Sequence, residues 1–312
     1  MGIVWTTRIR LPGRARPSGG GHRAGEGRTG PDTSPPLGSA EPGALAADEP
    51  PGDEPPGDEP PGEERRGDEQ RGDEQRGDAP GRMPPVLMYH SVDHYREDPH
   101  LITVTPDRFL RQMRWLEANG LRGVGVGELL AAKAAGRHRR LVGLTFDDGY
   151  ADFAGQVVPV LTRMGFTATV FMVTGEIGGT NSWDDGPRKR LMSAEQLRAM
   201  AGWGMEVASH GVRHLSLPEV GHGELVRELR ESRSQLEDLL QRPVTGFAYP
   251  YGNVTSREAA AVREAGYDYA CAIWTSGADR HALARTYVGE RDDPLRMRLK
   301  FARHRFRQRR LA

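Results

Sequence analysis

The sequence predicts an α/β protein in which helices cover a sheet of parallel strands. Two observations carry this prediction. Short apolar segments typical of buried strands alternate along the chain with longer segments whose apolar residues recur at helical spacing. Repeated strand-then-helix units place neighbouring strands parallel to one another. The pattern holds six or seven strands, a number that fits both a closed barrel and an open doubly wound sheet.

The strand segments share a short apolar run that is bounded by polar or glycine-containing turns. In chain order they are residues 86–89, 141–146, 168–173, 206–209, 245–248 and 269–273. The last of them contains Cys271, the only cysteine of the chain, so no intrachain disulfide can form. We expect Cys271 to be a small buried apolar residue.

The helices begin at recognisable capping residues. Thr105 is a favourable N-cap and Pro106 suits the first helical turn, so a helix follows the first strand. Capping-box spacing starts two further helices, at residues 193–196 and 255–258. Apolar residues three or four positions apart indicate the remaining helices, at residues 128–135, 157–164 and 225–239. Residues 174–190 form a long glycine-rich loop.

The chain is expected to consist of a disordered tail, one domain and a basic end. Residues 1–82 are rich in Gly, Pro, Arg, Asp and Glu, and cannot bury enough apolar surface to offset chain entropy. Acidic five-residue repeats between Asp48 and Asp78 are typical of an extended linker. Residues 83–295 have a length that suits a single core, and residues 296–312 form the basic tail.

Charge and hydropathy restrict the partners of the chain. The net charge is zero, which does not indicate nucleic-acid binding. The segment from Arg296 to Arg310 nevertheless has eight Lys or Arg and no acid. We expect a solvated helix there, with weak contact to an anionic membrane or polymer as the alternative. The chain has no apolar run of about 18 residues that would span a membrane, and no secretory signal is visible.

Two motifs at the ends of predicted strands carry the chemistry. Asp147 and Asp148 follow one strand, and His210 and His214 follow another. One carboxylate and two imidazoles suit zinc or a similar ion, which leaves the other aspartate free as a base. Alone, Asp-Asp-Gly is often a turn, and two histidines four apart are often structural. Together they indicate a metal-dependent hydrolase, but not a zincin, because Gly211 stands where that motif needs Glu.

These motifs resemble those of the NodB-like polysaccharide deacetylases, and the resemblance extends from about Pro84 to about Val288. The matching segments are residues 145–149 for the first family motif, 209–214 for the second, 247–252 for the third and 85–92 for the start of many members. The resemblance implies a distorted, incomplete (β/α) barrel with its chemistry at the C-terminal ends of the strands. Members of the family usually work at the cell surface.

The resemblance also implies an activity and a role for each site residue. It assigns Asp148, His210 and His214 to one divalent ion, with zinc expected and cobalt, nickel or iron as alternatives. It assigns Asp147 to the general base and the backbone N–H of Tyr251 to the oxyanion. The implied reaction is hydrolysis of the N-acetyl group of an N-acetylhexosamine-containing polysaccharide or glycoconjugate, with release of acetate.

The chain departs from the common family pattern. Most members carry an arginine that orients the base where Ala248 stands, and most have an Asp-x-x-Asp-Trp motif and a late Leu-x-His that are missing here. By resemblance, the poly-N-acetylglucosamine deacetylase branch takes its general acid from an early Tyr-His. We therefore expect His90 to be the acid, with His281 as the alternative, while the orientation of Asp147 is unexplained.

Two other functions stay open at this point. The same metal site suits a hydrolase of a small amide, imide or ester. A catalytically idle carbohydrate-binding protein would also keep the barrel, and the missing arginine favours it slightly. Trp183 lies in the long loop, where it either stacks on a sugar ring or caps the core.

Overall fold

The computed structural model describes residues 82–273 and 279–311. The expected N-terminal tail therefore lies almost wholly outside the described residues. Within the described part, no helix is long and apolar enough to cross a membrane.

The described residues form a sheet in which every strand pairs in parallel with its neighbours, as predicted. Its strands are β1 (Val86–Tyr89), β4 (Arg122–Val124), β5 (Leu141–Phe146), β6 (Thr169–Met172), β7 (Glu206–Ser209), β8 (Gly246–Ala248), β9 (Tyr269–Ala272), β10 (Leu283–Ala284) and β11 (Thr286–Tyr287). They follow the order β10-β9-β8-β7-β6-β5-β1-β11, and β4 also pairs with β5.

The sheet closes through one short stretch of chain. β10 pairs with β9 and β11 pairs with β1, and only Arg285 separates β10 from β11. Residues 283–287 thus join the two edges of the sheet into a nearly closed barrel, which confirms the expected (β/α) barrel. The sequence pattern missed this stretch and β4, because segments of two or three residues carry no periodicity.

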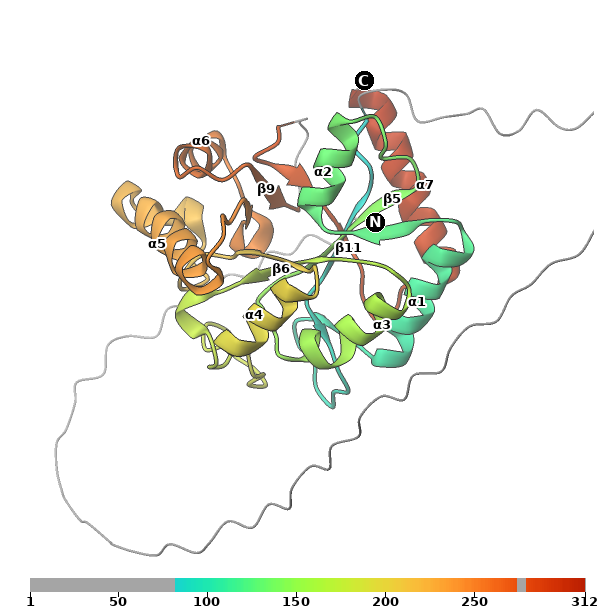
Figure 1. The fold of residues 1–312 in the computed structure, drawn as a ribbon, viewed down its shortest axis with the longest axis horizontal. Helices are drawn as coiled ribbons and strands as arrows, with labels where there is room; N and C mark the ends of the chain where they lie inside the picture. Colours follow the sequence, from blue (N-terminus) through green and yellow to red (C-terminus); the bar gives the residue numbers. More distant parts are fainter. Residues whose placement is uncertain (1–81, 274–278, 312) are drawn as a thin grey trace, which may run out of the picture. The chain divides into compact units, whose positions relative to one another are not determined.

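Helices lie around the strands (Figure 1). They are α1 (Pro106–Ala118), α2 (Val126–Ala134), α3 (Val158–Arg163), α4 (Ala194–Gly202), α5 (His222–Leu240), α6 (Ser256–Glu264) and α7 (Pro294–Leu311). The predicted caps are confirmed at three of them, since Thr105 caps α1 and capping boxes start α4 and α6. The residues expected as a basic tail make up most of α7, whose Met297 is fully buried.

Two shorter features lie close to the edge of the barrel where β1 and β5 end. β2 (Ser91–Val92) pairs with β3 (Thr103–Val104) just after β1, and one π-helical turn (Phe153–Val157) precedes α3. The aromatic core next to them stacks Tyr89 on Phe146 with 5.2 Å between ring centroids. This packing holds the ends of β1 and β5 together, and those ends carry His90 and Asp147.

Candidate active site

The structure brings the predicted site residues to one edge of the barrel. His90 directly follows β1, Asp147 and Asp148 follow β5, and His210 follows β7. Tyr251 lies in the turn after β8. Because all these strands are parallel, their C-terminal ends meet at the same edge.

The turn after β5 requires unusual backbone angles. Asp148 has φ 71° and the following Gly149 has φ 80°. A Cβ on Gly149 would lie only 2.2 Å from the Met172 sulfur, so glycine alone fits there. His214 and Tyr251 also have positive φ, at 58° and 60°. Such conformations in non-glycine residues gather where the surrounding structure holds functional groups in place.

Asp148, His210 and His214 form a buried cluster with the geometry of a metal site. Oδ1 of Asp148 lies 3.4 Å from Nε2 of each histidine. One ligand atom from each residue lies within 4.8 Å of the others. Burial would raise the pKa of Asp148, but the hydrogen bonds from both histidines outweigh it and hold this pKa well below its ordinary value. An ionised carboxylate and two imidazole nitrogens are the donors that zinc prefers.

Neighbouring groups fix the orientation of the two histidine rings in this cluster. Nδ1 of His210 lies 2.8 Å from the carbonyl oxygen of Ala248, which leaves Nε2 for the cluster. Trp183 stacks on His214 at 4.7 Å, and the Tyr251 ring meets the same imidazole edge-on at 4.6 Å. Trp183 also packs partly buried against the main core. Its ring therefore supports a candidate metal ligand, a role that was not among the two expected for it.

Asp147 is held by an arginine that the sequence analysis missed. Arg285 donates two hydrogen bonds to Asp147, at 2.5 Å to Oδ1 and 2.8 Å to Oδ2. Burial would raise the pKa of Asp147, but the charges of Arg285, His210 and His90 outweigh it and lower that pKa. Ala248 cannot orient the carboxylate of Asp147. Arg285, in the short segment that closes the barrel, orients it instead. The available signal was one charged residue in the strand-like run at residues 283–287.

The two candidate acids lie in different places. Nε2 of His90 is 3.9 Å from Oδ2 of Asp147, and its side chain is 16% exposed. His90 Nδ1 is buried without a hydrogen-bond partner among the described residues. Nε2 of His281 instead lies 3.0 Å from the carbonyl oxygen of Tyr267. The hydroxyl of Tyr249 donates to the backbone carbonyl of His281. Only His90 adjoins Asp147.

A polar network joins the His90 segment to the long loop. The Ser91 hydroxyl donates to Asp152 Oδ2 at 2.5 Å and accepts from the Lys189 ammonium at 2.8 Å. The backbone N–H of Val92 donates to the other Asp152 oxygen at 3.0 Å. Lys189 is part of the loop that also carries Trp183, so one network positions both sides of the site.

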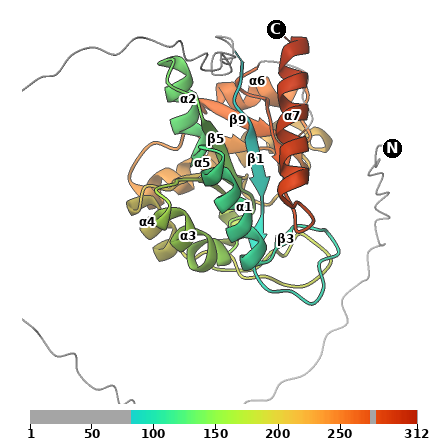
Figure 2. The ribbon, with the colours of Figure 1, turned by 90° about the vertical axis from the view of Figure 1, so that its right-hand side faces the viewer.

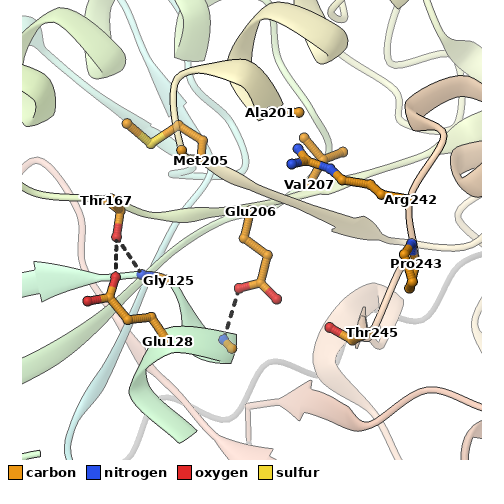
Figure 3. A pocket seen from close by; sticks show the side chains of 12 residues that line it. Gly125, Glu128, Thr167, Ala201, Met205, Glu206, Val207, Arg242, Pro243 and Thr245 are labelled. Atoms are coloured by element: carbon orange, nitrogen blue, oxygen red, sulfur yellow. Dashed lines mark hydrogen bonds between the residues drawn. The ribbon is translucent and has the colours of Figure 1, made fainter. Parts of the chain in front are cut away.

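A cavity of about 340 Å³ lies away from this cluster, around the starts of β7 and α2 (Figure 3). Its lining includes Gly127, Glu128, Thr167, Glu206 and Arg242. None of the six predicted site residues lines it. The cavity therefore opens at the opposite edge of the barrel, where strands begin.

Comparisons with known proteins find relatives of this chain. Residues 134–270 match the family model described as polysaccharide deacetylase. YxkH of Bacillus subtilis is provisionally named a polysaccharide deacetylase. It is 28% identical over 210 residues, and the match covers 65% of this chain and 71% of that protein. The poly-β-1,6-N-acetyl-D-glucosamine N-deacetylase of Staphylococcus aureus is 24% identical over 177 residues, and the match spans 54% of this chain and 60% of that relative.

Solved structures share the fold. The Streptococcus pyogenes deacetylase PplD in complex with acetate has a TM-score of 0.61 at 21% identity, covering 70% of this chain and 97% of that one. IcaB from Ammonifex degensii has a TM-score of 0.57 at 23% identity, covering 73% of this chain and 98% of that one. Residues 134–270 therefore match the polysaccharide deacetylases, a family of hydrolases, and the described residues share the fold of PplD and IcaB.

Proposed function

We propose that the protein removes the N-acetyl group from an N-acetylhexosamine polymer or glycoconjugate and needs one divalent metal ion to do so. The observation that carries this proposal is the buried Asp147, which Arg285 orients beside both His90 and the Asp148 cluster. The staphylococcal relative is named for poly-β-1,6-N-acetyl-D-glucosamine. That name makes β-1,6-linked oligomers of N-acetylglucosamine the first substrate to test.

Asp148, His210 and His214 would hold the ion, and zinc fits their donor set best. When bound, such an ion polarises a carbonyl and makes water more acidic. The protein fits this use because the Ala248 carbonyl binds Nδ1 of His210 and so leaves its Nε2 as the ligand. Trp183 and Tyr251 restrict the rotation of the His214 ring by contacts on its face and edge.

Asp147 is the base that accepts the proton of the attacking water. Its lowered pKa keeps it ionised at neutral pH, where it is ready to accept. The two hydrogen bonds from Arg285 fix the orientation of the carboxylate plane, so the base does not rotate away from the reacting atoms. Without this pairing, a carboxylate buried as deeply as Asp147 would tend to take up a proton.

Protonation of the leaving amine and stabilisation of the oxyanion fall to two further groups. His90 lies beside Asp147 and retains a partly exposed ring, so it can deliver a proton to the amine nitrogen. The Tyr251 backbone N–H is the candidate oxyanion donor, since its turn has a fixed, positive φ at the edge of the site. A donor of this kind typically contributes about 10²–10³ in rate.

The proposal is tested by metal content together with acetate release from β-1,6-linked N-acetylglucosamine oligomers. One ion per chain and metal-dependent acetate release are expected. Hydrolysis of small amides or esters alone would favour the second kind of hydrolase. Oligosaccharide binding without metal or turnover would indicate an idle carbohydrate-binding protein.

The role of His90 is tested with two substrate types. His90→Ala should keep the metal and lower turnover of the acetamide strongly, on the order of 10²-fold. It should affect an activated aryl acetate much less, because that leaving group departs without a proton. His281→Ala is the matched control, and it should leave the ratio of the two activities unchanged. Equal losses on both substrates for His90→Ala would contradict the acid role.

A further inference from the structure

One face of the C-terminal helix α7 packs on the domain. Met297 is fully buried, and the Phe301 ring lies 5.3 Å from the ring of Trp115 on α1. His304 lies on the same face, with Nε2 2.8 Å from the carbonyl oxygen of Met83. Figure 2 shows α7 upright at the edge of the domain, beside α1 and β1. The opposite face of the helix points away from the barrel.

That outer face carries a stripe of apolar side chains. Leu295 is 65% exposed, Leu299 is 60% exposed and Phe306 is 56% exposed. Ala302, which is also exposed, fills the gap between Leu299 and Phe306. The four positions are four, three and four residues apart, which is the spacing of one helix face. Leucines exposed to this degree contribute little to folding of the domain itself.

Arginines flank the stripe on both sides. At 100° per residue, Arg296 and Arg303 fall on one side of the stripe, and Arg298 and Arg305 fall on the other. All four are exposed, and none forms an ion pair with a residue that the structure describes. No acidic residue occurs from Pro294 to Leu311. Their positive charge is therefore not neutralised within the helix.

We propose that this outer face of α7 binds the surface of an anionic lipid bilayer. An apolar stripe between two rows of basic residues is the pattern of a helix that lies in the plane of a membrane interface. The leucines would enter the boundary between headgroups and acyl chains, and the arginines would contact the anionic headgroups. Binding by one helix face of this size is reversible.

Other occupants fit the stripe less well. A second copy of the chain would bring arginine rows of like charge together. The acidic segment from Asp48 to Asp78 complements the arginines in charge, but it consists only of Asp, Glu, Pro, Gly, Arg and Gln. It has no aliphatic or aromatic side chain, so its proline rings are the only apolar groups that it could place on Leu295 and Leu299. A bilayer satisfies both the charge and the apolar side chains.

The test measures binding of the full chain to vesicles by flotation. We expect binding to vesicles of equal parts phosphatidylglycerol and phosphatidylcholine, and none to phosphatidylcholine alone. The double variant Arg296→Gln, Arg303→Gln should bind about 25-fold more weakly, about fivefold for each arginine. Arg111→Gln with Arg114→Gln, which removes the same charge from the exposed face of α1, is the matched control and should bind as the parent does.

The apolar stripe is tested separately. Leu295→Gln with Leu299→Gln should weaken binding on the order of tenfold, while Trp203→Gln at the exposed end of α4 should not. Loss of binding in the arginine variant but not in the leucine variant would show a contact through charge alone and overturn the proposal. Absence of binding of the full chain to the anionic vesicles would overturn it as well. Melting temperatures equal to that of the parent would show that each variant is folded.

Discussion

Acidic side chains lie at both edges of the barrel, and Glu206 at one edge has different partners from Asp147 and Asp148 at the other. At the edge where strands begin, Glu206 has its oxygens satisfied by neutral donors. Oε2 accepts from the Gly127 backbone at 2.9 Å and from Thr169 at 2.6 Å, and Oε1 accepts from Tyr269 at 2.7 Å. At the edge where strands end, Asp147 faces a buried arginine and Asp148 faces two histidines.

This difference shows that the position of a cavity does not by itself identify the candidate active site of this fold. The cavity of about 340 Å³ lies at the Glu206 edge, where the carboxylates of Glu206 and Glu128 are already engaged (Figure 3). The residues that can hold an ion and move a proton lie at the other edge. In (β/α) barrels, features at the strand starts generally serve stability and those at the strand ends serve function. The following substitutions test that division.

The largest effect should come from the two adjacent aspartates. Asp147→Asn should keep the metal and lower turnover by about 10²-fold or more, because an amide cannot accept the proton. Asp148→Asn should lose the metal and the activity together, since an anionic ligand is removed. Elemental analysis and acetate release measure the two quantities. Loss of the metal in Asp147→Asn instead would exchange the two roles.

Arg285→Ala should have the next largest effect. Turnover should fall on the order of tenfold to a hundredfold, because Asp147 loses its orientation. The free energy of unfolding should fall by about 3–5 kcal/mol, since the buried carboxylate loses its partner. Kinetics and urea denaturation report these changes. Arg257→Ala is the control, because Arg257 also bonds a buried carboxylate, that of Glu258. Unchanged turnover in Arg285→Ala would show that Arg285 only stabilises the fold.

Trp183→Ala should weaken the metal site more than it affects the fold. His214 would lose the ring stacked on it, and loss of a group that orients a ligand typically costs about tenfold or more in metal affinity. Competition with a chelator measures this affinity. Trp203 is an exposed tryptophan at the C-cap of α4, and Trp203→Ala should leave the affinity unchanged. Equal affinities in both variants would contradict the proposed support of His214.

The smallest effect on turnover is expected at the opposite edge. Glu206→Gln should leave turnover within about twofold of the parent, because Glu206 lies at the strand starts. It should lower the free energy of unfolding by about 1–3 kcal/mol, since Thr169 or Tyr269 is left poorly paired. Urea denaturation and acetate release measure both quantities. A tenfold loss of turnover would contradict the assignment of stability to one edge of the barrel and of reactivity to the other.

Local sequence patterns were enough to predict the longer strands and the helices, and to place most of the site residues. Alternating apolar runs and capping residues are local signals, and they predicted the parallel strands and the starts of α1, α4 and α6. Motifs that directly follow strands placed Asp147, His210 and His90 at a common edge, because the geometry of parallel strands allows no other arrangement.

The way in which these groups are held became visible only in the folded barrel. The bond between Arg285 and Asp147 joins residues 138 positions apart, so no local pattern records it. The same applies to the stacking of Trp183 on His214 and to the separation of His281 from Asp147. The closing strand was hidden for a related reason: two-residue pairings on either side of Arg285 have no periodicity and exist only once β9 and β1 are in place. Local periodicity predicts elements, whereas contacts between distant segments arise from packing.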